Sequence, residues 1–209
     1  MATADGEAEA RIDAALIARA VQLHDRDAFG QLMLRHLGLV RAQLRRLTGG
    51  DHAWADDIAQ ETFLQAWRKL DQFRGGSRFS TWLFQVSYAT FLQAARRSKS
   101  QARWQTESAL AQADAPPDDS ELRTLHLDLT GALMQLPEGQ RAALVHCYHL
   151  GLSNEEAAQV LGIPVGTVKS LVARGKSKLR QLLSGYEAHK GDNLAGPTPV
   201  SCGEEHGRR

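Results

Sequence analysis

Hydrophobic side chains recur every three or four positions along most of this chain, the spacing that places them on one side of an α-helix. The first helical run covers residues 12–97 and is punctuated by a glycine-containing turn at 49–51 and by a glycine pair at 75–76. A second run covers residues 122–183 and is broken by Pro137. No segment alternates convincingly like a strand, so the pattern predicts an all-α fold with two small helical domains.

The segments around these runs lack helical periodicity. Residues 98–121 contain a pair of prolines and a string of acids, which predicts a flexible, extended linker. Residues 1–11 and 186–209 are expected to be disordered, since they offer little apolar surface to bury. The expected domains are therefore residues 12–97 and 122–185.

The most specific local signal lies in residues 152–183, which match a helix-turn-helix. Ser153 and Glu156 have the spacing of a capping box, in which each side chain satisfies a free backbone N–H where a helix starts. Gly162 suits the left-handed end of that helix, and Pro164 suits the first turn of the next helix. The two helices are then joined by a tight turn.

The second helix of this motif is predicted to be apolar on one side and basic on the other. Counting about 100° per residue from Val168 places Lys169, Ser170, Ala173 and Arg174 on the side opposite the apolar residues. The helix carries several bases and no acid, which suits a helix lying along phosphates in a DNA major groove. The alternative is an amphipathic helix whose basic face is simply solvated.

Acidic and aromatic side chains share the predicted helix at residues 55–70. Asp57 and Glu61 lie on consecutive turns, and Phe63 and Trp67 form an adjoining stripe. This arrangement suits docking onto a basic partner helix. The alternative is a surface helix whose acidic first turn is stabilised by the helix dipole.

Aromatic side chains alternate with arginines in residues 71–97. Aromatic faces can stack on unpaired bases while arginines follow the phosphates, which is the chemistry of single-strand binding. The alternative is that Trp82, Phe91 and their neighbours are core. Phe73 differs because it lies in a glycine-rich loop beside Arg74, and loop residues carry function more often.

Composition limits the classes of function that remain open. The net charge is +1, but acids and bases are concentrated in different segments, so this total does not argue against nucleic acid. No apolar run approaches the length of about 20 residues that a membrane span needs. The first residues lack the positive charges of a secretory signal, so we expect a cytoplasmic location without membrane insertion. Cys147 and Cys202 do not form a disulfide framework.

Catalytic and metal-binding patterns find little support. Asp56 and Asp57 are adjacent and diverge by about 100° on a helix, so they cannot converge on one reacting group. His146, Cys147 and His149 lack a fourth ligand spaced to close a tetrahedral site. We therefore expect no enzymatic activity, no metal and no cofactor.

Five segments, taken in order, resemble one known family, the extracytoplasmic-function (ECF) group of sigma-70 factors. These proteins are dissociable promoter-recognition subunits of bacterial RNA polymerase. The resemblance covers about residues 13–183. The matching segments are AFGQLMLRH (28–36), ADDIAQETFLQAW (55–67), DQFRGGSRFSTWLF (71–84), LPEGQRAALV (136–145) and LSNEEAAQVLGIPVGTVKS (152–170).

The resemblance implies that the first domain is sigma-70 region 2 and the second is region 4. Region 2 would grip the coiled coil of the largest subunit of core RNA polymerase and hold the melted −10 element, with a base flipped out beside Phe73 at a cost of a few kcal/mol. Region 4 would bind the −35 element as duplex DNA. The implied polymerase-binding residues are Asp56, Asp57, Gln60, Glu61, Phe63 and Trp67. The implied −10 residues are Phe73, Arg74, Arg78, Phe79, Trp82, Tyr88, Arg96 and Arg97. The implied −35 residues are Thr167, Lys169, Ser170, Ala173, Arg174 and Lys176.

Two departures from the family pattern affect which promoter is recognised. Ala89 stands where the family often has an asparagine that contacts the flipped base. The recognition helix has Lys169, Ser170 and Leu171 where Arg-Ser-Arg is common, and Ala173 replaces a frequently larger side chain. Lysine cannot reproduce the bidentate contact of arginine with guanine, so the family's −35 preference does not transfer.

The resemblance also implies regulation by an anti-sigma factor that wedges between the two domains, and a linker that follows the RNA exit channel of the polymerase. A different class of protein remains an alternative. A free-standing helix-turn-helix regulator would use its N-terminal helices for sensing or dimerisation, and it would bind paired half-sites about one helical turn apart.

Overall fold

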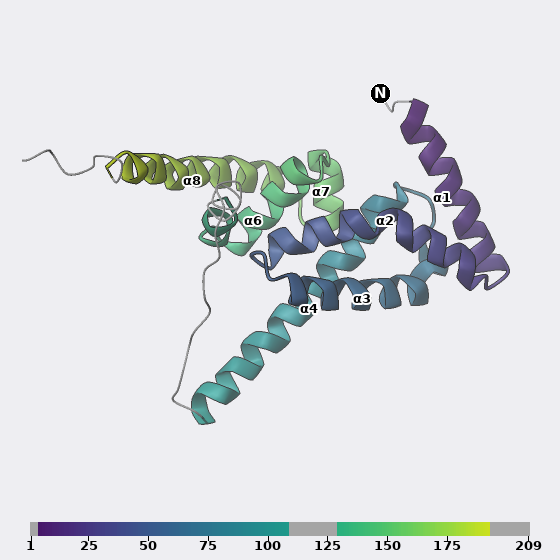
Figure 1. The fold of residues 1–209 in the computed structure, drawn as a ribbon. Coiled ribbons are helices and arrows are strands. Elements are labelled where there is room, and N and C mark those ends of the chain that lie inside the picture. The colour runs from purple at the N-terminus through teal and green to yellow at the C-terminus, as the bar shows by residue number, and fades with distance from the viewer. Residues whose placement is uncertain (1–3, 109–128, 193–209) are drawn as a thin grey trace, which may run out of the picture.

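The computed structural model describes residues 4–108 and 129–192, and its regular structure in this part of the chain is helical (Figure 1). None of the described helices is both long and apolar enough to cross a membrane. The elements are α1 (Ala4–Gln22), α2 (Arg26–Leu47), α3 (His52–Lys69), the 3-10 turn η1 (Leu70–Gln72), α4 (Phe79–Ser108), α6 (Glu138–Leu144), the π-helical turn η2 (Val145–His149), α7 (Asn154–Leu161) and α8 (Val165–Asp192), with a further helical segment at 129–134.

The N-terminal half is built around α2, which packs against α1, α3 and α4. The start of α2 is fixed by Asp25, whose carboxylate accepts from the backbone N–H of Ala28 at 3.0 Å. Asp51 caps α3 in the same way, since it accepts from the N–H of Trp54 at 2.9 Å. An aspartate at this position satisfies N–H groups that the helix itself leaves free. The apolar stripe of α2 is thereby held over the core, where Leu32 is fully buried.

The C-terminal half contains the predicted helix-turn-helix. The capping box is confirmed, because Ser153 accepts from the N–H of Glu156 and the Glu156 carboxylate accepts from the N–H of Ser153. Gly162 ends α7 with φ of 67°, the left-handed conformation expected of it. Pro164 lies directly before α8 rather than inside its first turn, and its carbonyl accepts the N–H of Val168.

Three predicted segment boundaries were wrong, each because a helix runs further than expected. Residues 4–11 belong to α1, since their alanines and glutamates are strong helix formers. The α4 helix continues through residues 98–108, where no proline or glycine interrupts it, although an extended linker was expected from residue 98. Likewise α8 continues to Asp192 instead of ending near 185. The remaining parts of the predicted linker and tail, 109–121 and 193–209, lie outside the described residues.

The two halves of the protein are packed against one another, which the sequence pattern did not indicate. Helix α7 lies against α4, and η2 lies against α2. Ala142, Val145 and Val160 of the second half belong to the same hydrophobic cluster as Leu44 and Phe84 of the first half. The two helical halves are therefore closed on each other and share part of one hydrophobic core.

Candidate functional site

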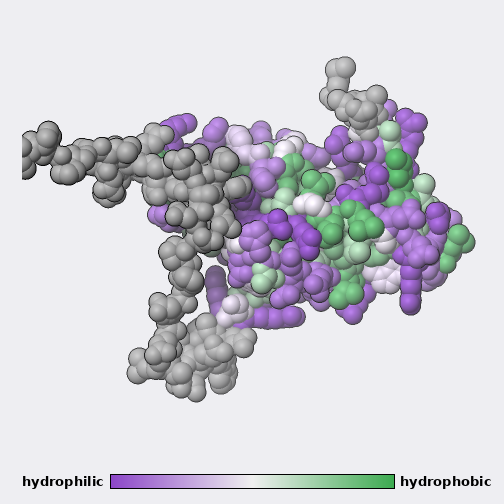
Figure 2. Space-filling view, in the orientation of Figure 1, coloured by the Kyte–Doolittle hydropathy of each residue, from purple (hydrophilic) through white to green (hydrophobic). Residues whose placement is uncertain are grey.

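A hydrophobic groove of about 590 Å³ runs between α2 and α3. Figure 2 shows hydrophobic side chains gathered over these two helices, flanked by hydrophilic ones. The rings of Phe29 and Trp67 lie 4.9 Å apart and join the two walls. The apolar lining consists of Phe29, Met33, Leu37, Ala59, Phe63, Leu64 and Trp67. A groove of this kind accepts the apolar face of a helical partner.

The polar residues that line this groove are Arg26, Arg41, Asp56 and Gln60, and two of them, Asp56 and Gln60, are among the residues predicted to bind polymerase. Asp56 lies 2.9 Å from the Arg41 guanidinium and is therefore already paired. Asp57 and Gln60 are exposed, while Glu61 is half-buried and accepts from the Gln65 amide at 2.6 Å. Acids beside an apolar floor suit a partner helix with basic residues at its edge.

Phe63 and Trp67, the other two residues predicted to bind polymerase, form part of the floor. Phe63 is only 6% exposed, so most of its ring supports the groove from beneath. Trp67 is half-buried and presents part of its indole to the groove. Four of the six predicted residues, Asp56, Gln60, Phe63 and Trp67, thus line the groove, whereas Asp57 and Glu61 lie on α3 outside its lining.

Three aromatic rings cluster around the glycine-containing loop between η1 and α4. The Phe73 ring lies 5.6 Å from both Phe79 and Trp82, and Phe79 and Trp82 are 5.5 Å apart. Phe73 and Trp82 are half-buried, whereas Phe79 is 5% exposed and belongs to the core. Gly75 has φ of 73°, a conformation that lets this loop turn back on itself. We refer to Phe73, Phe79 and Trp82 as the aromatic cluster.

The other predicted −10 residues do not all converge on this cluster. Arg74 and Arg78 are exposed beside it. Arg96 and Arg97 are exposed on α4, about 25 Å farther along the helix at 1.5 Å per residue. Tyr88 is 8% exposed and is covered by the second half of the protein, so its ring does not face solvent in this arrangement.

The first three turns of α8 present an exposed face that contains five of the six predicted −35 residues, namely Thr167, Lys169, Ser170, Ala173 and Arg174. The Ser170 hydroxyl donates to the Thr167 carbonyl at 2.9 Å, and the Arg174 guanidinium lies 3.2 Å from the Ser170 hydroxyl. The sixth residue, Lys176, is also exposed, but its ammonium donates to the Tyr148 hydroxyl at 3.0 Å. Lys176 is therefore directed toward Tyr148 in this structure.

A buried hydrogen bond joins the two halves and was missed from the sequence. The Nε2 atoms of Gln43 on α2 and His146 on η2 are 2.8 Å apart, and both residues are fully buried. His146 Nδ1 lies 2.7 Å from the Ala142 carbonyl, which can only accept, so Nδ1 carries the proton and Nε2 accepts from the Gln43 amide. The Tyr88 ring packs edge-on against His146 at 5.5 Å.

Burial lowers the pKa of His146 to about 4, an effect that the hydrogen bond to the Ala142 carbonyl only partly offsets. The Tyr88 pKa is raised to about 12, mainly by burial and also by the nearby Glu138 carboxylate. Both groups are therefore neutral at pH 7. The buried contact between Gln43 and His146, and the Tyr88 ring beside it, therefore involve uncharged side chains.

The closed fold is expected to lose stability as the pH falls. The folded pKa of His146 lies near 4 and the ordinary pKa of histidine is 6.5, so the unfolded chain takes up a proton first. The contribution of His146 to stability is therefore complete above pH 6.5 and declines down to pH 4. At about 1.4 kcal/mol per pKa unit, the free energy of unfolding at pH 5 should be roughly 2 kcal/mol below its value at pH 7.5. Urea denaturation at the two pH values measures this. The variant His146→Leu cannot titrate at this position and should show a smaller difference, and an equal difference would contradict the assignment.

The comparisons with known proteins cover both halves. Residues 32–101 match the family described as Sigma-70 region 2, and residues 126–179 match Sigma-70, region 4. The chain is 34% identical to the RNA polymerase sigma factor NccH of Alcaligenes xylosoxydans xylosoxydans, over 82% of this chain and 95% of that protein. It is 37% identical to the ECF RNA polymerase sigma factor SigM of Mycobacterium tuberculosis, over 84% of this chain and 86% of SigM.

Structural comparison leads to the same family. The sigma factor RpoE from Bartonella quintana, solved in complex with the anti-sigma factor NepR, superposes with a TM-score of 0.63 at 30% identity, over 75% of this chain and 96% of RpoE. Sequence and fold thus agree over both halves and in the same order. This chain belongs to the ECF group of sigma-70 RNA polymerase sigma factors.

Proposed function

We propose that this sigma factor docks onto core RNA polymerase through the groove between α2 and α3. The observation that carries the proposal is the combination of an apolar groove of about 590 Å³ with acidic side chains, Asp57 and Glu61, on the adjoining surface of α3. A coiled coil of the largest polymerase subunit would place apolar side chains on the floor and basic side chains at Asp57 and Glu61. Asp56 would contribute less directly, because Arg41 already neutralises it.

Promoter DNA would be bound at two separate surfaces. The aromatic cluster and the exposed Arg74 and Arg78 would hold the melted −10 element, since aromatic rings stack on unpaired bases. The exposed face at the start of α8 would enter the major groove of the duplex −35 element. Docking on polymerase would hold both surfaces near the promoter and raise their effective concentration.

We further propose regulation by an anti-sigma factor in the cytoplasm, where the polymerase is found. The relative from Bartonella quintana was solved with such a partner. In this chain the halves are already closed on each other, and Tyr88 is covered by the second half. A partner that stabilised this closed arrangement would keep the two DNA-binding surfaces from reaching the −10 and −35 elements at the same time.

Transcription in vitro tests the proposed function. Promoters are first selected from genomic fragments by the protein together with core polymerase, and run-off transcription is then measured with and without the protein. Specific transcripts are expected only when both are present. Unchanged initiation without the protein would refute the proposal. Tight, symmetric DNA protection by the isolated protein would instead indicate a free-standing helix-turn-helix regulator.

The variants Lys169→Ala and Arg174→Ala are expected to weaken binding to the −35 element by about 1 to 3 kcal/mol where the side chain contacts a base. Loss of a phosphate contact would instead weaken binding to all sequences evenly. Fluorescence anisotropy with duplex −35 DNA and with scrambled DNA measures both effects. Lys178→Ala is the matched control, since it removes the same charge as Lys169→Ala from an exposed position farther along α8. Wild-type affinity in both test variants would show that α8 does not use this face.

A further inference from the structure

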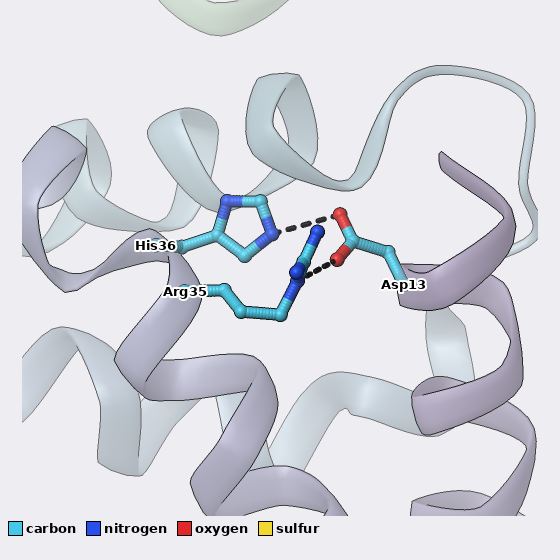
Figure 3. Close-up of polar contacts among 3 residues, drawn as sticks. All are labelled: Asp13, Arg35 and His36. Atoms are coloured by element: carbon cyan, nitrogen blue, oxygen red, sulfur yellow. Dashed lines mark hydrogen bonds and ion pairs between the residues drawn. The ribbon is translucent and has the colours of Figure 1, made fainter. Parts of the chain in front are cut away.

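Helix α1 is connected to the aromatic cluster through a buried polar contact. Asp13 on α1 lies 2.8 Å from His36 Nε2 on α2, and its other carboxylate oxygen accepts from Arg35 Nε at 2.9 Å (Figure 3). The side chains of Asp13 and His36 are each only 10% exposed. Because a carboxylate can only accept, His36 Nε2 is the donor in this contact.

The Asp13 contact determines how the His36 ring is oriented. The other ring nitrogen, Nδ1, is buried and has no hydrogen-bond partner among the residues that the structure describes. No second polar contact therefore fixes the ring at this nitrogen. A buried hydrogen bond to a charged group is short and directional, so it holds the ring in one position.

The His36 ring also contacts the aromatic cluster. The His36 ring packs edge-on against Phe79, with ring centres 5.2 Å apart. Phe79 in turn contacts both Phe73 and Trp82 at 5.5 to 5.6 Å. Residues 74–76 of the loop after Phe73 are exposed, so the rings of the cluster are held by their contacts with one another and with the core, of which the packing of His36 behind Phe79 is part.

We propose that His36, held by Asp13, is a positioning residue for the −10 binding surface. Its ring supports Phe79 from behind, and Phe79 sets the spacing between the two rings that remain partly accessible, Phe73 and Trp82. Helix α1 thereby contributes to promoter melting without touching DNA. This inference rests on the proposed role of the aromatic cluster in binding the melted −10 element.

The test uses holoenzyme assembled from core polymerase and the full chain, with two DNA probes from a selected promoter. One probe carries a single-stranded −10 element, and the other carries only the duplex −35 element. The variants are Asp13→Ala, which removes the acceptor, and His36→Gln, which retains an N–H donor but has no ring to place against Phe79. Arg19→Ala is the matched control, since it breaks an exposed ion pair with Asp25 near the end of the same helix.

Both test variants are expected to bind the −10 probe about tenfold more weakly, the loss that corresponds to one hydrogen bond or ring contact. Their affinities for core polymerase and for the −35 probe should equal those of wild type and of Arg19→Ala. Equal losses on both probes would indicate a general structural defect and overturn the positioning role. Wild-type binding of the −10 probe by both variants would also overturn it.

The variant Phe73→Ala separates this inference from the proposed function. It should lose −10 binding whether or not His36 positions the cluster. If Phe73→Ala binds the −10 probe like wild type, then the assignment of the cluster to the −10 element fails. If Phe73→Ala loses binding while Asp13→Ala and His36→Gln do not, the cluster assignment stands and the role of His36 is refuted.

Discussion

Replacing His146 by alanine is expected to lower the free energy of unfolding by about 3 to 5 kcal/mol. The ring is fully buried between the two halves and packs against Tyr88, so its removal leaves a cavity. It also removes the partner at 2.8 Å of one Gln43 N–H, while the other N–H keeps its bond to the Phe84 carbonyl at 3.3 Å, and the lost hydrogen bond adds to the cost. Urea denaturation at pH 7.5, followed by circular dichroism, measures this change.

Two further variants show whether the loss belongs to this contact. Tyr148→Ala removes a neighbouring ring that is 61% exposed, and it should cost much less than His146→Ala. The double variant Gln43→Leu/His146→Phe replaces both polar partners by apolar side chains and should recover a large part of the stability, because neither buried amide nor imidazole remains unpaired. An equal loss in Tyr148→Ala and His146→Ala would contradict the importance of the buried contact.

Reversing the charge of Asp57 is expected to weaken binding to core polymerase about 100-fold, since unfavourable like-charge contacts at an interface cost several kcal/mol. Asp57 is exposed on α3 next to Asp56, which lines the groove, so Asp57→Arg leaves the core undisturbed. The adjacent Asp56 is paired with Arg41, which leaves Asp57 as the more accessible charge for a partner. Competition with a labelled wild-type sigma factor for core polymerase measures the affinity.

Glu9→Arg provides the control for this prediction. Glu9 is an exposed acid on α1, and the substitution changes the net charge of the chain by the same amount. A similar loss in both variants would mean that overall charge, rather than the groove, governs binding. Unchanged affinity in Asp57→Arg would remove Asp57 from the polymerase-binding surface.

The sequence predicted the helix-turn-helix well because several local signals agree in register. The capping box at Ser153 and Glu156 and the left-handed Gly162 depend only on residues within one or two turns. Helical periodicity likewise predicted the all-α fold. The roles assigned to individual site residues stay predictions, although four of the six polymerase-binding candidates do line the groove between α2 and α3.

Helix ends were predicted less well, and two predicted DNA contacts are buried in this arrangement. The change to polar composition after Arg97 predicts a linker, but polarity alone does not end a helix when proline and glycine are absent. Phe79 and Tyr88 are largely buried. The spacing of aromatic residues along α4 alone cannot tell whether they are buried or exposed. Tertiary contacts decide that question.

The contact between the halves could have been suspected from α2. His36, Val40, Gln43 and Leu47 recur at helical spacing, so two polar residues lie on the apolar stripe of this helix. Polar groups at such positions need buried partners. The sequence does not say where those partners are, since His146 lies 103 residues away from Gln43.

The uncharged nature of the Gln43 and His146 contact has a consequence for how this protein responds to ionic strength. Salt screens charges and weakens DNA binding steeply, because counterions must be released from the phosphates. A buried hydrogen bond between neutral side chains is not weakened in this way. Added salt should therefore release the protein from DNA while leaving the buried contact between Gln43 and His146 intact.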